Sequence, residues 1–182
     1  MINRDKFFNG YREYFGNLNQ SQVDAINFIL DKLDNSVRFN LATEYAYILA
    51  TIKHETAETF KPIREYGKGK GRAYAKVYPN GNSYYGRGYV QLTWDFNYKK
   101  LGNILDIPLY QEPDLALNPD IAYDILEYGM YHGFFTGKKM SMYFNDNKTD
   151  FLHARKIING MDKAGLIADY AVKFNKIIEF TE

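Results

Sequence analysis

The stretch that decides the fold covers residues 41–59 and reads LATEYAYILATIKHETAET. Within it, residues recur at helical steps of four, three, four and three: Leu41, Tyr45, Ile48, Ile52 and Glu55. An α-helix completes one turn in ~3.6 residues, so these side chains share one face. The pattern predicts a helix over residues 41–59 with a buried apolar stripe.

Glu55 closes this stripe near the C-terminal end of the predicted helix. Partial burial and the negative end of the helix dipole both disfavour a charged carboxylate there. We therefore expect Glu55 to hold a proton near neutral pH, as a general acid must. Two nearby carboxylates are candidate partners: Glu58, one turn further along the helix, and Glu65, in a loop beyond Pro62.

Other segments also carry helical spacing or helix-start signals. Ser21 with Asp24 has the form of a capping box, and Thr93 is placed to cap a helix that runs through Asn97 and Tyr98. The expected helices cover residues 1–17, 19–34, 41–59, 93–101, 118–135, 150–159 and 164–178. The predicted fold is predominantly α-helical, a lysozyme-like domain of two lobes around a substrate cleft with minor β structure.

The 182 residues contain no linker, low-complexity segment or internal repeat, which favours a single catalytic domain over 1–182. We expect the helices of 1–40 to pack on a core of 41–178, with no separate wall-binding module. Lys plus Arg number 23 and Asp plus Glu 22, so charge gives no reason to expect nucleic-acid binding. The chain has no cysteine, no apolar run of signal-peptide length and no membrane-length apolar segment.

Metal and nucleotide chemistry are disfavoured by spacing. His54-Glu55 begins a zinc-protease pattern, but position 58, where a second histidine is required, is Glu58. The glycines of 67–71 lack the strand-then-helix context of a phosphate loop. We expect no metal and no cofactor.

The segment of residues 84–98 reads YYGRGYVQLTWDFNY. Two glycines flank Arg87, and Gln91, Thr93 and Asn97 follow with aromatic residues between them. Such amide, hydroxyl and aromatic groups suit the hydroxyls, acetamides and apolar faces of sugars. A loop that enters an aromatic core would explain the aromatic residues of the segment, but it explains the polar set less well.

These residues resemble the family 19 glycoside hydrolases, the group of plant-type chitinases and many phage endolysins. The family signature, an aromatic residue followed by Gly-Arg-Gly-x-x-Gln-Leu-Ser/Thr and then Asn-Tyr, is matched at residues 85–93 and 97–98. The resemblance implies that Glu55 is the general acid, that Glu65 is the base and that Thr93 helps to hold the nucleophilic water. It also implies roles in the substrate cleft for a set of other residues: His54, Tyr85, Arg87, Gln91, Asn97, Tyr98 and, in a later Ile-Asn-Gly segment, Asn159.

The implied activity is cleavage of β-1,4-glycosidic bonds in peptidoglycan with inversion at the anomeric carbon, as in a phage endolysin. A chitinase is the first alternative, and an inactive glycan-binding or virion structural protein is the second; a toxin delivered by a secretion system is a variant of the first reading. We expect a monomer that binds peptidoglycan or chitin strands and does not insert into membranes. Without a signal peptide, it is expected to be made in the host cytoplasm and released to the wall, most simply through a holin.

Overall fold

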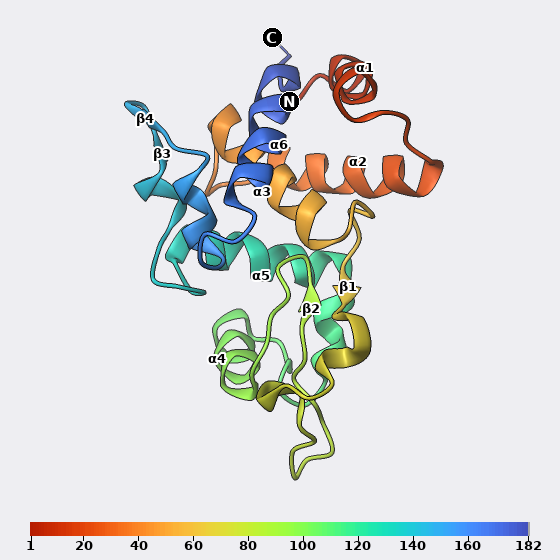
Figure 1. Ribbon diagram of the computed structural model, residues 1–182, viewed down its shortest axis with the longest axis vertical. Coiled ribbons are helices and arrows are strands. Elements are labelled where there is room, and N and C mark those ends of the chain that lie inside the picture. The colour runs from red at the N-terminus through yellow and green to blue at the C-terminus, as the bar shows by residue number, and fades with distance from the viewer. Residues whose placement is uncertain (182) are drawn as a thin grey trace. The chain divides into compact units, whose positions relative to one another are not determined.

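The computed structural model describes residues 1–181, and helices dominate it (Figure 1). The helices are α1 (Arg4–Phe15), α2 (Gln20–Asp34), α3 (Ala42–Glu55), α4 (Asp95–Leu105), α5 (Pro119–His132) and α6 (Ala164–Ile177). The strands of the described residues are two residues long and form two antiparallel pairs, β1 (Ile63–Arg64) with β2 (Arg87–Gly88) and β3 (Phe144–Asn145) with β4 (Lys148–Thr149). The predicted class, predominantly α-helical with minor β structure, is confirmed.

The chain divides into two compact units. The first contains Met1–Phe60 together with the residues from Glu127 onward, and the second is the continuous segment Lys61–Leu126. Helices α1, α2, α3 and α6 all belong to the first unit. The prediction of a single catalytic domain remains a prediction.

Helix α3 forms the centre of the first unit. Every residue from Glu44 to Lys53 is buried, so the burial surrounds the helix and is wider than the predicted stripe. Helix α6 packs against α3, and α1 packs against α6 through rings that include Phe7 and Phe174. A helix buried on all sides holds its last residues rigidly, because its axis cannot tilt without disturbing close-packed neighbours.

Several helix caps and lengths differ from the predictions, among them the end of α3, which lies at Glu55 and not at Thr59. Helix α2 is capped by Asn19, whose side chain accepts from the backbone N–H of Gln22, because Ser21 already lies in the first helical turn. Helix α4 begins after Trp94 and has no side-chain cap, so Thr93 does not cap it. The predicted helix of 150–159 is reduced to a 3-10 turn, His153–Ile157.

The two ends of the chain meet at one edge of the first unit (Figure 1). The backbone N–H of Asn3 donates to the carbonyl of Glu179 at 2.8 Å, and that of Thr181 donates to the carbonyl of Met1 at 2.7 Å. These bonds tie the start of the chain to the end of α6. Among residues 1–181, no helix combines the length and the apolar character that a membrane crossing requires.

The second unit is built around a short antiparallel pair and long loops. Ile63 of β1 lies opposite Gly88 of β2, and Arg64 lies opposite Arg87. Between the two strands the chain runs through two 3-10 turns, Tyr66–Gly69 and Ala73–Ala75. This pairing brings residue 65, directly after β1, against residue 86, directly before β2.

Candidate active site

Glu55 is the last residue of α3, and its carboxylate meets an arginine that is distant in sequence. The Nη1 atom of Arg155 lies 2.5 Å from Oε1 of Glu55, and the two side chains are only 5% and 14% exposed. This ion pair fixes the position of the Glu55 side chain, because a guanidinium and a carboxylate attract each other and form strong hydrogen bonds. Within residues 1–181, Oε2 of Glu55 accepts no hydrogen bond.

Arg155 is the functional candidate that the sequence reasoning missed. It lies in the 3-10 turn His153–Ile157, and its Nε donates to the carbonyl of Asp162 at 3.0 Å. Its own carbonyl accepts from the backbone N–H of Asn159 at 3.0 Å. The available signal was a basic residue three positions before the Ile-Asn-Gly segment of residues 158–160.

His54 and Asn159 lie in the same unit as Glu55. Burial lowers the pKa of His54 below its ordinary value, with Arg155 acting in the same direction and Glu55 opposing both. A neutral imidazole can donate with one nitrogen and accept with the other. Asn159 is exposed, and its Oδ1 accepts from the backbone N–H of Gly160 at 2.8 Å, which leaves its amide N–H₂ group directed to solvent or ligand.

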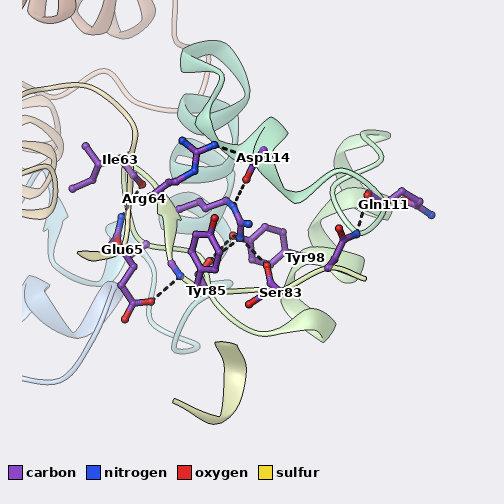
Figure 2. A network of polar contacts seen from close by, with 12 residues as sticks. Ile63, Arg64, Glu65, Ser83, Tyr85, Tyr98, Gln111 and Asp114 are labelled. Atoms are coloured by element: carbon purple, nitrogen blue, oxygen red, sulfur yellow. Dashed lines mark hydrogen bonds and ion pairs between the residues drawn. The ribbon is translucent and has the colours of Figure 1, made fainter. Parts of the chain in front are cut away.

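Glu65 is held by the second unit through hydrogen bonds alone. Its Oε1 accepts from the hydroxyl of Tyr74 at 2.6 Å. Its Oε2 accepts from the backbone N–H of Gly86 at 2.9 Å (Figure 2). The backbone N–H of Glu65 also donates to the carbonyl of Gly86 at 2.7 Å. Two donors on one carboxyl group suit an ionised carboxylate, which is the form a general base needs.

Tyr74 remains a donor to Glu65 over a wide pH range. Burial and the hydrogen bond to Glu65 raise the pKa of Tyr74 to about 12. The hydroxyl therefore keeps its proton at neutral and moderately alkaline pH.

Gly86 lets two predicted site residues approach each other. A Cβ at this position would lie 2.8 Å from Oε1 of Gln91 and 3.2 Å from Cβ of Glu65. Gln91 itself has a φ of 53° and donates through Nε2 to the carbonyl of Ile63 at 3.2 Å. The absence of a side chain at residue 86 thus allows Glu65 and Gln91 to share one small region.

Arg87 and Tyr98 are buried, and their polar groups bind inside the second unit. The Nε of Arg87 lies 2.7 Å from Oδ1 of Asp114, and its Nη1 donates to the carbonyls of Ser83 and Tyr85 (Figure 2). The hydroxyl of Tyr98 donates to the carbonyl of Tyr85 at 2.9 Å. These two residues support the segment that carries Gly86 and Gln91, and their predicted roles in the substrate cleft stay predictions.

Asp114 connects Arg87 to Arg64 of β1. It receives Arg87 on one oxygen and Nη2 of Arg64 on the other, each at 2.7 Å. Burial alone would raise the pKa of Asp114, but the hydrogen bonds from Arg64 and Arg87 outweigh it and hold the pKa below its ordinary value. The guanidinium of Arg87 also lies over the ring of Tyr85, 3.7 Å from the ring centre.

Thr93 lies two residues before α4, and Asn97 lies in its first turn. Nδ2 of Asn97 donates to the carbonyl of Thr93 at 3.0 Å. Within residues 1–181, no hydrogen bond involves the hydroxyl of Thr93, which is half-buried. That hydroxyl is therefore free to bind a water molecule, as the resemblance implies.

Glu58, the alternative base, lies beyond the end of α3. Its Oε1 is 3.1 Å from Nζ of Lys53, and its side chain is 56% exposed. The predicted site residues thus form two sets. His54, Glu55 and Asn159 gather around Arg155 in the first unit, and the second unit holds Glu65, Tyr85, Arg87, Gln91, Thr93, Asn97 and Tyr98.

Comparison with known proteins identifies the region that carries these residues. The model of the family described as Chitinase class I, glycoside hydrolase family 19, matches residues 44–130. An endochitinase of Arabidopsis thaliana, At2g43620, is 39% identical over 83 residues, which cover 44% of this chain and 29% of the relative. The basic endochitinase CHB4 of Brassica napus is 33% identical over 110 residues, 57% of this chain and 39% of the relative. The chain therefore matches well under half the length of these curated relatives.

Two solved structures share the fold. Chitinase C from Streptomyces griseus HUT6037 superposes with a TM-score of 0.67 at 23% identity, covering 93% of this chain and 75% of that one. A bacterial family 19 chitinase superposes with a TM-score of 0.59 at 22% identity, covering 97% and 94%. The predicted resemblance is confirmed: residues 44–130 of this chain match the model of glycoside hydrolase family 19.

Proposed function

We propose that this protein is a glycoside hydrolase that cleaves the β-1,4 bonds of peptidoglycan by a single displacement with inversion. The observation that carries the proposal is the pair of differently held carboxyl groups. Glu55 has one oxygen on Arg155 and the other without a hydrogen bond among residues 1–181, and Glu65 accepts one hydrogen bond on each oxygen. An inverting enzyme needs this division between an acid and a base.

In this mechanism Oε2 of Glu55 gives its proton to the glycosidic oxygen as the bond to the anomeric carbon breaks. Glu65 removes a proton from a water molecule that attacks the opposite face of the sugar, and the hydroxyl of Thr93 orients that water. His54, Gln91, Asn97 and Asn159 offer amide and imidazole groups to the sugar substituents.

The charge of the second unit favours peptidoglycan over chitin. From Tyr66 to Trp94 the chain has no Asp or Glu and five basic residues: Lys68, Lys70, Arg72, Lys76 and Arg87. The first three are exposed, and among residues 1–181 no ion pair includes them. Peptidoglycan carries the carboxylates of its peptide stems and chitin is uncharged, so only the former gains from a basic surface.

Hydrolysis of chitin is the second candidate function. It is favoured by the endochitinase relatives and by the match to the chitinase class I model. The two activities share the carboxyl groups and differ in the sugar that bears the new reducing end. An inactive glycan-binding protein stays the third possibility.

Product analysis separates these functions. Purified peptidoglycan and chitin oligomers are incubated with the wild-type protein, and the new reducing ends and their first anomeric form are identified by mass spectrometry and NMR. We expect N-acetylmuramic acid ends in the α-configuration. Products from chitin alone would overturn the proposal and support chitin hydrolysis. If neither polymer gives products, the result would support an inactive glycan-binding protein.

The contribution of the basic surface is tested with Lys68→Gln/Lys70→Gln/Arg72→Gln. We expect a higher KM for peptidoglycan and a weaker dependence of KM on salt between about 50 and 300 mM, because salt screens exposed charges. Kinetics on neutral chitin oligomers should not change. The matched control is Lys138→Gln/Lys139→Gln, which removes exposed charges from the first unit. Equal effects of both variants would remove the charge argument for peptidoglycan.

A further inference from the structure

Lys53 is a buried cation two residues before Glu55. It is 2% exposed, on the last turn of α3. Burying an ammonium group is costly unless it is paired, so the surroundings of Lys53 must compensate for lost water. An apolar residue would fill this position in the centre of the unit at no such cost.

Aromatic rings enclose the ammonium group. Its Nζ lies 4.9 Å from the ring centre of Phe15, 5.2 Å from that of Tyr170, 5.6 Å from that of Tyr11 and 5.9 Å from that of Phe60. It also donates to the hydroxyl of Tyr11 at 3.2 Å. Cations are attracted to the faces of such rings, most strongly where water is excluded. We call these four rings the lysine cage.

The cage gathers three separate parts of the first unit. Tyr11 and Phe15 come from α1, Tyr170 comes from α6, and Phe60 follows the end of α3. The cation therefore links the end of α3 to both helices that pack around it. Burial raises the pKa of Tyr11, with Glu58 and Tyr170 adding to the effect, so its hydroxyl stays neutral beside Lys53.

The backbone directly after Glu55 is strained. Ala57, Glu58 and Phe60 have φ values of 48°, 66° and 56°, although none of them is glycine. L-residues avoid this region, and such conformations persist only where the surroundings enforce them. Several contacts with surrounding residues are therefore needed to stabilise this turn.

Lys53 makes two of these contacts, both with Glu58. Its Nζ lies 3.1 Å from Oε1 of Glu58, and its carbonyl accepts from the backbone N–H of Glu58 at 2.8 Å. Thr56 makes a third contact: its hydroxyl accepts from the backbone N–H of Phe60 at 3.0 Å. Phe60 then returns to the lysine cage with its ring.

We propose that Lys53 is a positioning residue: its caged ammonium group holds the strained turn of residues 57–60 and thereby fixes the end of α3 that presents Glu55. The proposal rests on the proposed function, in which Glu55 is the general acid. It also assigns Glu58 to the turn as the partner of Lys53, in place of the reserve role as base. Lys53 touches no reacting atom.

The test combines Lys53→Met, which keeps the length of the side chain and removes its charge, with Glu58→Gln and with the double variant. We expect each single variant to lower kcat about tenfold with little change in KM, because the acid is misplaced and substrate binding is not. The double variant should lose no more than either single variant, because both break one interaction. Unchanged kcat in Lys53→Met would overturn the proposal, as would a loss in Glu58→Gln of about 10³-fold beside an active Lys53→Met, the result expected of a general base.

A physical readout accompanies the kinetics. Hydrogen exchange of the backbone N–H groups of Glu58 and Phe60 should become faster in Lys53→Met, while those of α2 keep their wild-type rates. The control is Ile29→Val, which lowers the stability of the same unit without touching the cage and should leave kcat and these two exchange rates unchanged. Equal exchange rates in wild type and Lys53→Met would show that the turn does not depend on the cation.

The two proposals fail in different ways. If the wild type and Glu55→Gln degrade polymer equally, the proposed function fails, whereas the exchange experiment still reports whether Lys53 holds the turn. If Glu55→Gln is inactive and Lys53→Met has full activity, the proposed function stands and the positioning role falls.

Discussion

The end of α3 in the first unit and the loop after β1 in the second unit each present one carboxyl group, and they hold it differently. Glu55 ends a helix that is buried on all sides, and its partner is the buried charge of Arg155. Glu65 lies in a glycine-rich loop, and its partners are the hydroxyl of Tyr74 and a backbone N–H. The helical position provides rigidity and the loop position provides donors, so the same residue type can serve two chemical roles.

The largest effects should come from one substitution made at both positions. Glu55→Gln and Glu65→Gln are each expected to lower kcat by about 10³-fold or more, since each removes an acid or base. Their stabilities should differ: Glu55→Gln leaves Arg155 buried without a counter-charge and should lower Tm by roughly 5–10 °C. Thermal unfolding followed by circular dichroism measures this.

Glu65→Gln should leave Tm almost unchanged, because no buried cation depends on Glu65. Equal Tm values for the two variants would contradict the contrast drawn between helix and loop. Wild-type kcat in Glu65→Gln would remove Glu65 from the mechanism.

The next largest effect is expected at Gly86. A methyl group there meets Cβ of Glu65 at 3.2 Å and the end of the Gln91 side chain at 2.8 Å, so Gly86→Ala must displace the loop carboxylate. We expect kcat to fall by about tenfold to a hundredfold, as for a small misplacement of a reacting group. The matched control is Gly165→Ala in α6, where a Cβ meets nothing within 4 Å. Similar kinetics for the two alanine variants would mean that the close approach has no role.

A smaller effect is expected from Tyr74→Phe. It removes one of the two donors to Glu65 and leaves the other in place. We expect kcat to fall by about three- to tenfold, because water replaces a donor that is only partly buried. Tyr78→Phe is the control, since that hydroxyl donates to Asp95 at 2.8 Å and not to Glu65. A larger loss in Tyr78→Phe than in Tyr74→Phe would contradict the assignment.

The smallest effect concerns alkaline pH. Burial and a hydrogen bond to a carboxylate raise the pKa of Tyr74 and of Tyr78 to about 12, above the ordinary value of 10.0. The folded state thus favours the neutral hydroxyls, so their contribution is complete below pH 10 and is lost as pH rises towards about 12. The free energy of unfolding, measured with urea, should fall over this window more steeply in the wild type than in Tyr74→Phe/Tyr78→Phe. Parallel curves of unfolding free energy against pH would contradict the raised pKa values of the two tyrosines.

Sequence periodicity predicted what depends on neighbours along the chain. The steps from Leu41 to Glu55 placed the glutamate at the end of a buried helix, and the glycines around Arg87 marked the loop segment. The end of α3 was predicted four residues too late, at Thr59, because Ala57 and Glu58 are ordinary helix formers. Their positive φ values belong to a turn in which Glu58 bonds to Lys53, a contact that no local pattern records.

Contacts between residues distant in sequence could not be predicted for the same reason. Arg155 joins Glu55 across 100 residues, and a single sequence does not indicate which basic residue will close such a distance. The resemblance implied a role for Arg87 in the substrate cleft; its contacts with Asp114 and with two backbone carbonyls are long-range features that the motif does not indicate.

The order of the units along the chain sets the order in which the protein matures on the ribosome. Glu65, Tyr74 and Gly86 lie within 21 residues of one another in the continuous second unit, so they emerge together. Synthesis proceeds at about 5–20 residues per second, and Arg155 is therefore added roughly 5–20 s after Glu55. The closing bonds from Thr181 to Met1 come later still. The loop carboxylate can thus acquire its hydrogen-bond partners while the helical carboxylate still lacks Arg155.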